Sequence, residues 1–124
     1  MYNECSMSNV VSAPIDLRDR TFIFAKDVLR FSKQLPFNYL SRSIVSQLIR
    51  SSSSIGANFI EAKNASSKKD FKNKVFISKK EASETKYWLK LCEEFNSSPE
   101  LLKLQAECQE IILILQKIVT KLSH

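Results

Sequence analysis

The chain has 124 residues, enough for one domain with a single core, and 19 lysines and arginines against 13 acids give it a formal net charge of +6. One glycine and three prolines are too few for the turns of an all-β or α/β protein of this length, so the composition predicts an all-α fold. The positive charge favours polyanionic partners such as RNA, DNA or an anionic membrane surface. The alternative is that the charge only keeps a small bundle soluble.

Residues 1–14 are polar and unpatterned and end at a proline, so we expect a flexible N-terminal tail before a single domain over residues 15–124. The tail lacks the basic start and apolar run of a signal peptide, and no apolar run reaches the ~18 residues of a membrane span. Cys5, Cys92 and Cys108 are spaced for neither a disulfide framework nor a zinc site, and the last two fall on apolar helix faces. The sequence predicts a cytoplasmic protein with no membrane partner.

A first helix is predicted to begin near Asp16, which has the spacing of a capping pair with Asp19, and to end before Pro36, which disfavours helix in the residue preceding it. A second helix is predicted over residues 40–65. Gly56 lies inside it and costs about 1 kcal/mol relative to alanine. This glycine indicates that another backbone segment passes close to the helix, unless it is simply tolerated there.

The second helix carries a narrow polar stripe whose members are spaced three or four residues apart: Gln47, Arg50, Ser54, Asn58 and Glu61. Apolar rows flank the stripe and cover about half of the helix circumference, which is more than one partner helix needs. We therefore expect this helix to be buried on two sides, with its polar groups paired to a neighbour. The same reasoning predicts that the chain assembles with copies of itself.

A third helix is predicted from the capping pair Ser67 and Asp70 to about Phe95. A fourth begins at Ser98, because a serine cap followed by Pro99 is typical of a helix N-terminus. The fourth helix has a heptad seam through Leu101, Leu104, Cys108, Ile111, Leu115, Ile118 and Leu122, with further apolar residues outside it. Four helices with short connections predict an antiparallel up-and-down bundle.

Catalytic chemistry has little support in the sequence. The only histidine, His124, is the last residue, and no glycine-rich loop is present to hold a phosphate. Glu81 and Glu84, with Glu61 of the preceding helix nearby, form the best acidic cluster. Such a cluster either binds a divalent metal or forms salt bridges, and the missing histidines argue against a helical di-iron site. We predict a protein that is not an enzyme and has no metal or cofactor.

The favoured role for these acids is a polar layer between the second and third helices. Its members are Gln47, Arg50, Asn58, Glu61, Glu81 and Glu84. We expect Arg50 to be buried in this layer and to pair with Glu84 first and Glu81 second, since an unpaired charge in a bundle interior is costly.

A row of lysines on the third helix is the feature most suggestive of function. Its members are spaced 4, 7, 7 and 4 residues apart: Lys68, Lys72, Lys79, Lys86 and Lys90. They share one helix face over about 33 Å, and Lys69 and Lys80 flank them. The row is typical of a surface that follows nucleic-acid phosphates, and the alternative is an ordinary solvated helix face. Because only Tyr87 interleaves with the lysines, the pattern gives little support to single-strand base readout.

Several linked motifs resemble a known family. They are the run Arg50-Ser-Ser-Ser-Ser-Ile-Gly-Ala-Asn58, then Glu61-Ala62, Ser67-Lys-Lys-Asp-Phe71 and Lys80-Glu-Ala-Ser-Glu-Thr-Lys-Tyr-Trp-Leu89, together with Arg20-Thr-Phe-Ile-Phe-Ala25. At these separations the chain resembles the bacterial four-helix-bundle proteins named for 23S rRNA intervening sequences. The resemblance covers nearly all of the chain after the tail.

The resemblance implies a left-handed up-and-down bundle that assembles into a ring-like homopentamer. The biochemical role of the family is not established, so its name conveys genetic context only. A related group, the accessory proteins of diversity-generating retroelements, shares the bundle and binds nucleic acid and a reverse transcriptase. From residues and resemblance together we predict a homo-oligomeric basic protein that binds RNA or DNA through the lysine row. A protein-interaction scaffold, such as an accessory subunit of a reverse transcriptase, is the alternative.

Overall fold

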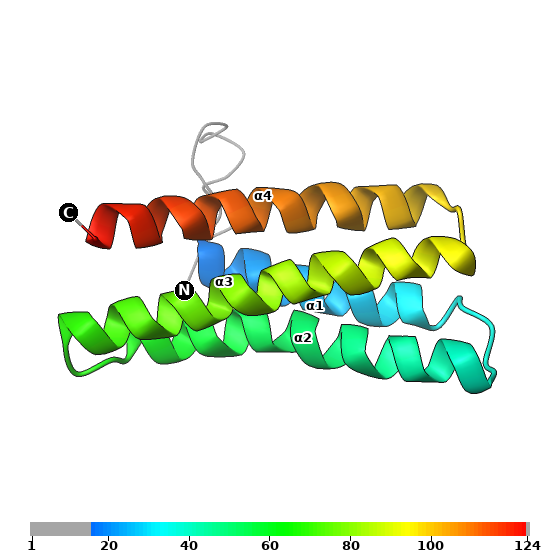
Figure 1. The fold of residues 1–124 in the computed structure, drawn as a ribbon, viewed down its shortest axis with the longest axis horizontal. Helices are drawn as coiled ribbons and strands as arrows, with labels where there is room; N and C mark the ends of the chain where they lie inside the picture. The colour runs from blue at the N-terminus through cyan, green and yellow to red at the C-terminus, as the bar shows by residue number, and fades with distance from the viewer. Residues whose placement is uncertain (1–15, 124) are drawn as a thin grey trace, which may run out of the picture.

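Four antiparallel helices joined by short connections make up the computed structural model, which describes residues 16–123. The helices are α1 (Leu17–Ser32), α2 (Tyr39–Lys63), α3 (Lys68–Leu91) and α4 (Pro99–Leu122), and a short 3-10 turn, η2 (Cys92–Glu94), follows α3. The α1–α2 and α3–α4 connections lie at one end of the bundle and the α2–α3 connection lies at the other (Figure 1). The all-α four-helix bundle predicted from the sequence is confirmed. The predicted tail over residues 1–14 lies outside the described residues.

The helices begin at capping residues that satisfy their free backbone N–H groups. Three of the four caps agree with the sequence prediction: the side chains of Asp16, Ser67 and Ser98 each accept a hydrogen bond from a backbone N–H two or three residues further on. The fourth cap was missed. Asn38 and Ser41 form a reciprocal capping box, in which each side chain accepts a hydrogen bond from the other residue's backbone N–H.

Three helix C-termini fall earlier than the sequence predicts, and that of α2, at Lys63, is two residues short of the predicted end. α1 ends at Ser32, and the chain then turns through short-range bonds before Pro36, of which the bond from Gln34 N to the Phe31 carbonyl is 2.9 Å long. The α-helical part of α3 ends at Leu91, because its last turn tightens into η2. All three differences concern the last turn of a helix, where α and 3-10 bonding compete closely.

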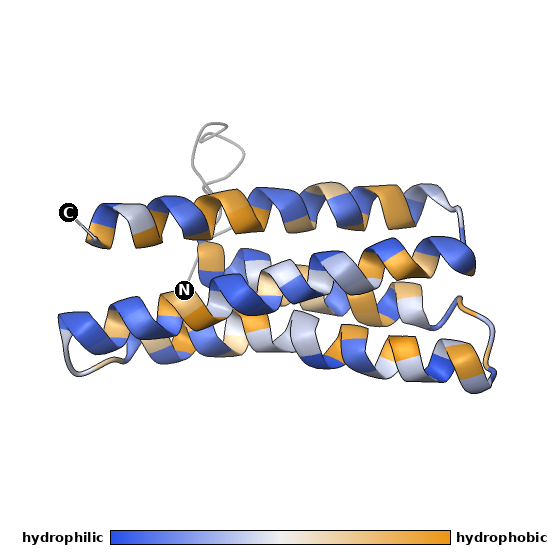
Figure 2. Ribbon diagram, viewed as in Figure 1, coloured by the Kyte–Doolittle hydropathy of each residue, from blue (hydrophilic) through white to orange (hydrophobic). Residues whose placement is uncertain are grey.

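The core is a continuous apolar layer to which all four helices contribute. Phe24, Val28 and Phe31 of α1 are buried in it. The heptad seam of α4 is buried from Leu101 to Leu115 and is partly exposed beyond that point. Hydrophobic residues recur along α4, whereas the first turns of α3 are mostly hydrophilic (Figure 2). Within residues 16–123, no helix is both long enough and apolar enough to cross a membrane.

Small residues let α2 approach both of its neighbours closely. A Cβ built on Gly56 would lie 2.9 Å from Thr21 Oγ1 and 3.8 Å from the Thr21 backbone carbon, so α1 passes directly over this glycine, as predicted. On the α3 side, the buried Ser78 hydroxyl donates a 2.7 Å hydrogen bond to the Ile55 carbonyl. The α2–α3 contact is the most extensive in the bundle. This contact fixes the register of α3 and therefore the directions in which its charged side chains point.

Candidate nucleic-acid interface

The lysine face of α3 comprises Lys68, Lys72, Lys79, Lys86 and Lys90. Lys68, Lys86 and Lys90 are exposed, whereas Lys72 and Lys79 are half-buried. The lysine face is therefore not a fully solvated helix face, since two of its five members are half-buried. Half-burial of a lysine is compatible with phosphate contact, since the aliphatic stem can pack on the helix while the ammonium group stays in water.

The ammonium groups of the lysine face have mostly neutral partners. Lys86 Nζ donates a 2.8 Å hydrogen bond to Gln109 Oε1 of α4, and Lys79 Nζ lies 5.9 Å from the centre of the Phe76 ring. Lys90 alone among the five approaches a carboxylate in the described part of the chain, with Nζ 3.9 Å from Glu93. The face therefore keeps most of its formal charge for an external anion.

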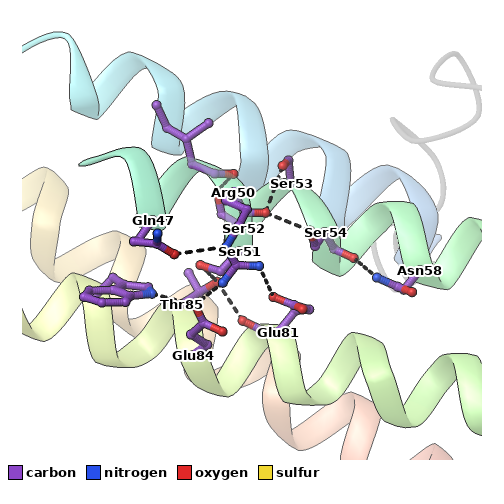
Figure 3. A network of polar contacts seen from close by, with 12 residues as sticks. Gln47, Arg50, Ser51, Ser52, Ser53, Ser54, Asn58, Glu81, Glu84 and Thr85 are labelled. Atoms are coloured by element: carbon purple, nitrogen blue, oxygen red, sulfur yellow. Dashed lines mark hydrogen bonds and ion pairs between the residues drawn. The ribbon is translucent and has the colours of Figure 1, made fainter. Parts of the chain in front are cut away.

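Arg50 is the centre of the polar network between α2 and α3 (Figure 3). Its Nη2 donates to Glu84 and its Nη1 donates to Glu81 at 3.1 Å, so both predicted contacts are present. Its Nε donates to Gln47 Oε1 at 3.1 Å. The Trp88 indole N–H donates to the same Glu84 carboxylate at 2.8 Å. One guanidinium thus links two successive turns of α3 to α2.

The predicted burial of Arg50 was wrong, because 45 % of its side chain is exposed. The network lies on the outer edge of the helix pair, where water screens the charges. The hydrogen bond from Trp88, followed by that from Arg50, holds the pKa of Glu84 below its usual value. The hydrogen bond to Glu84 in turn raises the pKa of Arg50.

Glu61 and Asn58 are on α2 but do not join the Arg50 network. Glu61 accepts a 2.8 Å hydrogen bond from Lys74 Nζ of α3. The Asn58 side-chain amide donates to the Ser54 carbonyl one turn earlier in its own helix. The acidic cluster suggested by the sequence is thus divided between two separate cationic partners.

The polar layer that is actually buried between α2 and α3 consists of hydroxyl groups. The Thr85 and Ser51 hydroxyls are 2.8 Å apart and both residues are buried, as is Ser78. Sequence reasoning missed Thr85 and Ser78 as members of this layer. A signal was present, since small polar residues recur at helical spacing in α3 among the apolar core positions Val75 and Ala82.

Two thiols lie in the core, as predicted. Burial raises the pKa of Cys92 to about 11 and that of Cys108 to about 12. The Cys108 Sγ contacts the Ala82 carbonyl at 3.3 Å. Since the thiolate is the nucleophilic and metal-binding form, these residues act as apolar packing groups near neutral pH.

The apolar surface left uncovered by the bundle differs from the prediction. The outer apolar residues of α2, such as Ile44 and Val45, are partly buried against the chain's own core. Large exposed apolar side chains lie on the other three helices: Phe22, Ile23 and Leu29 of α1, Phe76, Ile77 and Tyr87 of α3, and Leu102 and Leu113 of α4. α2 exposes Ile60 and, in its first turn, Tyr39 and Leu40, which follow the exposed Phe37 of the α1–α2 connection.

Comparison with known proteins identifies a matching family model and matching solved structures. A family model described as 23S rRNA-intervening sequence protein matches residues 15–117. The crystal structure of a protein of unknown function from the S23 ribosomal protein family of Bacteroides thetaiotaomicron VPI-5482 shares 33% sequence identity with a TM-score of 0.73. That match covers 84% of this chain and 98% of the solved one. No curated protein matches the chain.

Proposed function

The chain belongs to the 23S rRNA-intervening sequence protein family, and from this premise we propose that it is a non-enzymatic, cytoplasmic, homo-oligomeric bundle that binds RNA or another nucleic acid through the lysine face of α3. The observation that carries this proposal is the concentration of charge on one helix. α3 has eight lysines and three acids, whereas the whole chain has a formal net charge of +6.

Phosphate binding follows from the geometry of the lysine face. Its five members repeat along about 33 Å of helix, a length comparable with several nucleotides of a polyanion. Each phosphate that a lysine neutralises releases condensed counterions, which drives binding without reading the base sequence. Among the described residues the lysine face forms one ion pair, between Lys90 and Glu93, so little of its charge is neutralised by direct contact within the chain.

Self-association would strengthen such binding. Leu102 and Leu113 leave apolar surface on α4, and Phe22 and Leu29 do so on α1. Covering this surface in an oligomer removes it from water and brings several lysine faces together. Adjacent weak sites then act through effective concentration on one nucleic-acid chain.

The exposed apolar side chains of α1 and α4 also favour a second candidate function. They would suit docking of a different protein, with the bundle acting as a scaffold such as an accessory subunit of a reverse transcriptase. A scaffold binds its partner through apolar contacts and shows no counterion-release slope with RNA. The dependence of binding on salt therefore separates the two functions.

The test is RNA binding by a variant in which Lys68, Lys72, Lys79 and Lys86 are all changed to glutamine. We expect weaker binding to unrelated RNAs by a similar factor, and a salt slope of log K that shrinks by about 0.7–0.9 for each contact removed. The matched control changes four exposed lysines outside the lysine face to glutamine, namely Lys26, Lys103, Lys117 and Lys121, at the same cost in net charge.

If the two variants lose equal affinity, net charge rather than the lysine face governs binding, and the assigned site is wrong. Wild-type protein that ignores RNA at about 50 mM salt, where electrostatic binding is strong, contradicts the nucleic-acid function altogether. The scaffold function then takes its place.

A further inference from the structure

The α1–α2 connection and the first turn of α2 carry the most exposed large apolar side chains among residues 16–123. Phe37 is 87 % exposed, Tyr39 78 % and Leu40 68 %. We call these three residues, with the flanking Lys33 and Arg42, the α1–α2 tip. Isolated exposed apolar residues are common on protein surfaces, but three within four positions at one end of a bundle form a patch.

The backbone of the α1–α2 tip is held in place. Ser41 N donates to Asn38 Oδ1 at 3.0 Å, Asn38 N donates to Ser41 Oγ at 3.2 Å, and the Ser41 hydroxyl also bonds the Pro36 carbonyl. Ser41 is buried. Phe37 and Tyr39 lie on either side of Asn38, whose backbone these bonds hold. Their rings are therefore presented to solvent from an ordered backbone. Presentation from an ordered backbone reduces the entropy lost when a ligand binds.

The chain segment that contains the tip carries charge of one sign. Residues 28–60 contain no acid and four basic residues, of which three are arginines and one is a lysine. Lys33 and Arg42 are exposed, and neither forms an ion pair in the part of the chain that the structure describes. Exposed acids at this end of the bundle include Glu93 and Glu94 after α3 and Glu100 in the first turn of α4, where Glu100 lines a surface hollow with Gln34. These acids would direct an anion toward Arg42 on the α2 side of the tip.

A hollow in the surface lies beside the Tyr39 ring. Arg42, Ser43 and Ser46 line it together with Tyr39 and Leu40. The hollow thus combines an aromatic face, a guanidinium group and two hydroxyls. These groups match the base, the phosphate and the sugar hydroxyls of a nucleotide.

We propose that the α1–α2 tip is a stacking platform for unpaired nucleotides, with Phe37 and Tyr39 stacking on bases while Lys33 and Arg42 contact the adjoining phosphates. This inference rests on the nucleic-acid function proposed above and specifies the ligand as single-stranded. A duplex keeps its bases stacked on one another, so it can use the lysine face but not the tip.

Two double variants separate stacking from apolar burial. Phe37→Ala/Tyr39→Ala removes both rings, whereas Phe37→Leu/Tyr39→Leu keeps apolar side chains of useful size but has no π face. Both should weaken binding of a labelled single strand of about 12 nucleotides by at least ~5-fold per stacked base, and leave binding of the matching duplex unchanged. Phe22→Ala, at another exposed phenylalanine (62 %), is the control: it removes a ring from the α1 surface and should affect the single strand and the duplex by the same factor.

Tryptophan fluorescence reports directly whether a base stacks on the side chain at position 37. Phe37→Trp should keep wild-type affinity, and its added fluorescence should be quenched by single strands but not by duplex. Phe22→Trp should not be quenched by either, because its ring lies on α1 away from the tip.

The possible failures are distinguishable. If the Leu/Leu variant binds single strands like the wild type, or if single strands leave the added fluorescence of the Phe37→Trp variant unchanged, the stacking platform is refuted. Loss of binding confined to the glutamine variant of the lysine face refutes the tip and leaves the proposed function standing. Wild-type protein that binds vesicles of anionic phospholipid but no oligonucleotide overturns both, and identifies the tip as a membrane contact.

Discussion

Replacing Gly56 by alanine tests how closely α1 and α2 are packed. The new Cβ would lie 2.9 Å from Thr21 Oγ1 and 3.3 Å from Thr21 Cβ, both shorter than an ordinary van der Waals contact. Thr21 is fully buried, and its hydroxyl donates to the Leu17 and Arg18 carbonyls at 2.9 and 3.1 Å. A branched, hydrogen-bonded side chain on a helix cannot readily rotate away. The helices must therefore move apart.

Two opposing effects set the magnitude. Overpacking a well-packed core lowers the free energy of unfolding by about 1–3 kcal/mol, whereas the higher helix propensity of alanine raises it by about 1 kcal/mol. We therefore expect Gly56→Ala to lower the free energy of unfolding by about 0–2 kcal/mol, and not to raise it. Ala57→Gly, at the exposed neighbouring position, measures the propensity contribution in the same helix without the clash.

The assay is urea unfolding followed by circular dichroism for Gly56→Ala, Thr21→Ala and the double variant. Thr21→Ala removes Oγ1, the closer of the two contacts, and leaves Cβ at 3.3 Å, so Gly56→Ala should cost less when Thr21 is already alanine. The coupling between the two substitutions should then be at least ~1 kcal/mol, as for residues in direct contact. Stabilisation of the otherwise wild-type protein by Gly56→Ala, or additive effects of the two substitutions, would refute the close approach of α1.

The other contacts lead to three further predictions. Arg50→Ala should lower the free energy of unfolding by only about 0.2–1 kcal/mol, since the ion pairs are exposed; a loss of about 3 kcal/mol or more in chemical denaturation would restore the buried interpretation. The folded-state pKa of Glu84 lies below its ordinary value. The stability that the ionised Glu84 adds to the folded state is therefore present above the unfolded pKa and is lost as the pH falls through the folded pKa. In the Glu84→Gln variant, the free energy of unfolding should accordingly fall less steeply as the pH is lowered. An unchanged pH dependence at acid pH would contradict this. In a Cys5→Ser variant, Cys92 and Cys108 should react with a thiol reagent at about pH 8 only as fast as the protein unfolds, because burial raises both pKa values; fast labelling of the native protein would place one of them at the surface.

The fold could be predicted because its signals are local. Ser67 and Ser98 cap helices wherever they precede an amphipathic run, and Pro99 is suited to the first helical position whatever the bundle does. The burial of Cys108 follows from heptad spacing alone. The close contact at Gly56 was predicted for a similar reason. An interior glycine lowers helix stability, so it is expected where close packing leaves no room for a side chain.

The site could be predicted only in part, because side-chain burial depends on how far a helix is rotated within the bundle. The spacing of Gln47 and Arg50 places them on one stripe but does not say whether the stripe points inward or lies along an edge. The buried hydroxyls of Ser51 and Thr85 occupy the interior position instead, since small side chains permit the closer helix approach. The Asn38 cap was missed because Ser41 as its partner departs from the usual glutamate or glutamine.

The lysines of α3 outnumber its acids, and the two kinds of charge also lie on different sides of the helix. At 100° per residue, Asp70, Glu81 and Glu84 lie roughly 140–200° around the helix from the lysine face. Two of these acids turn toward α2, where Arg50 binds them, while Lys86 of the lysine face reaches Gln109 of α4. Arg50 therefore has a consequence beyond its small contribution to stability, because it neutralises carboxylates that would otherwise reduce the positive potential of α3. A polyanion on the lysine face meets a row of cations whose helix keeps its own acids on the opposite side.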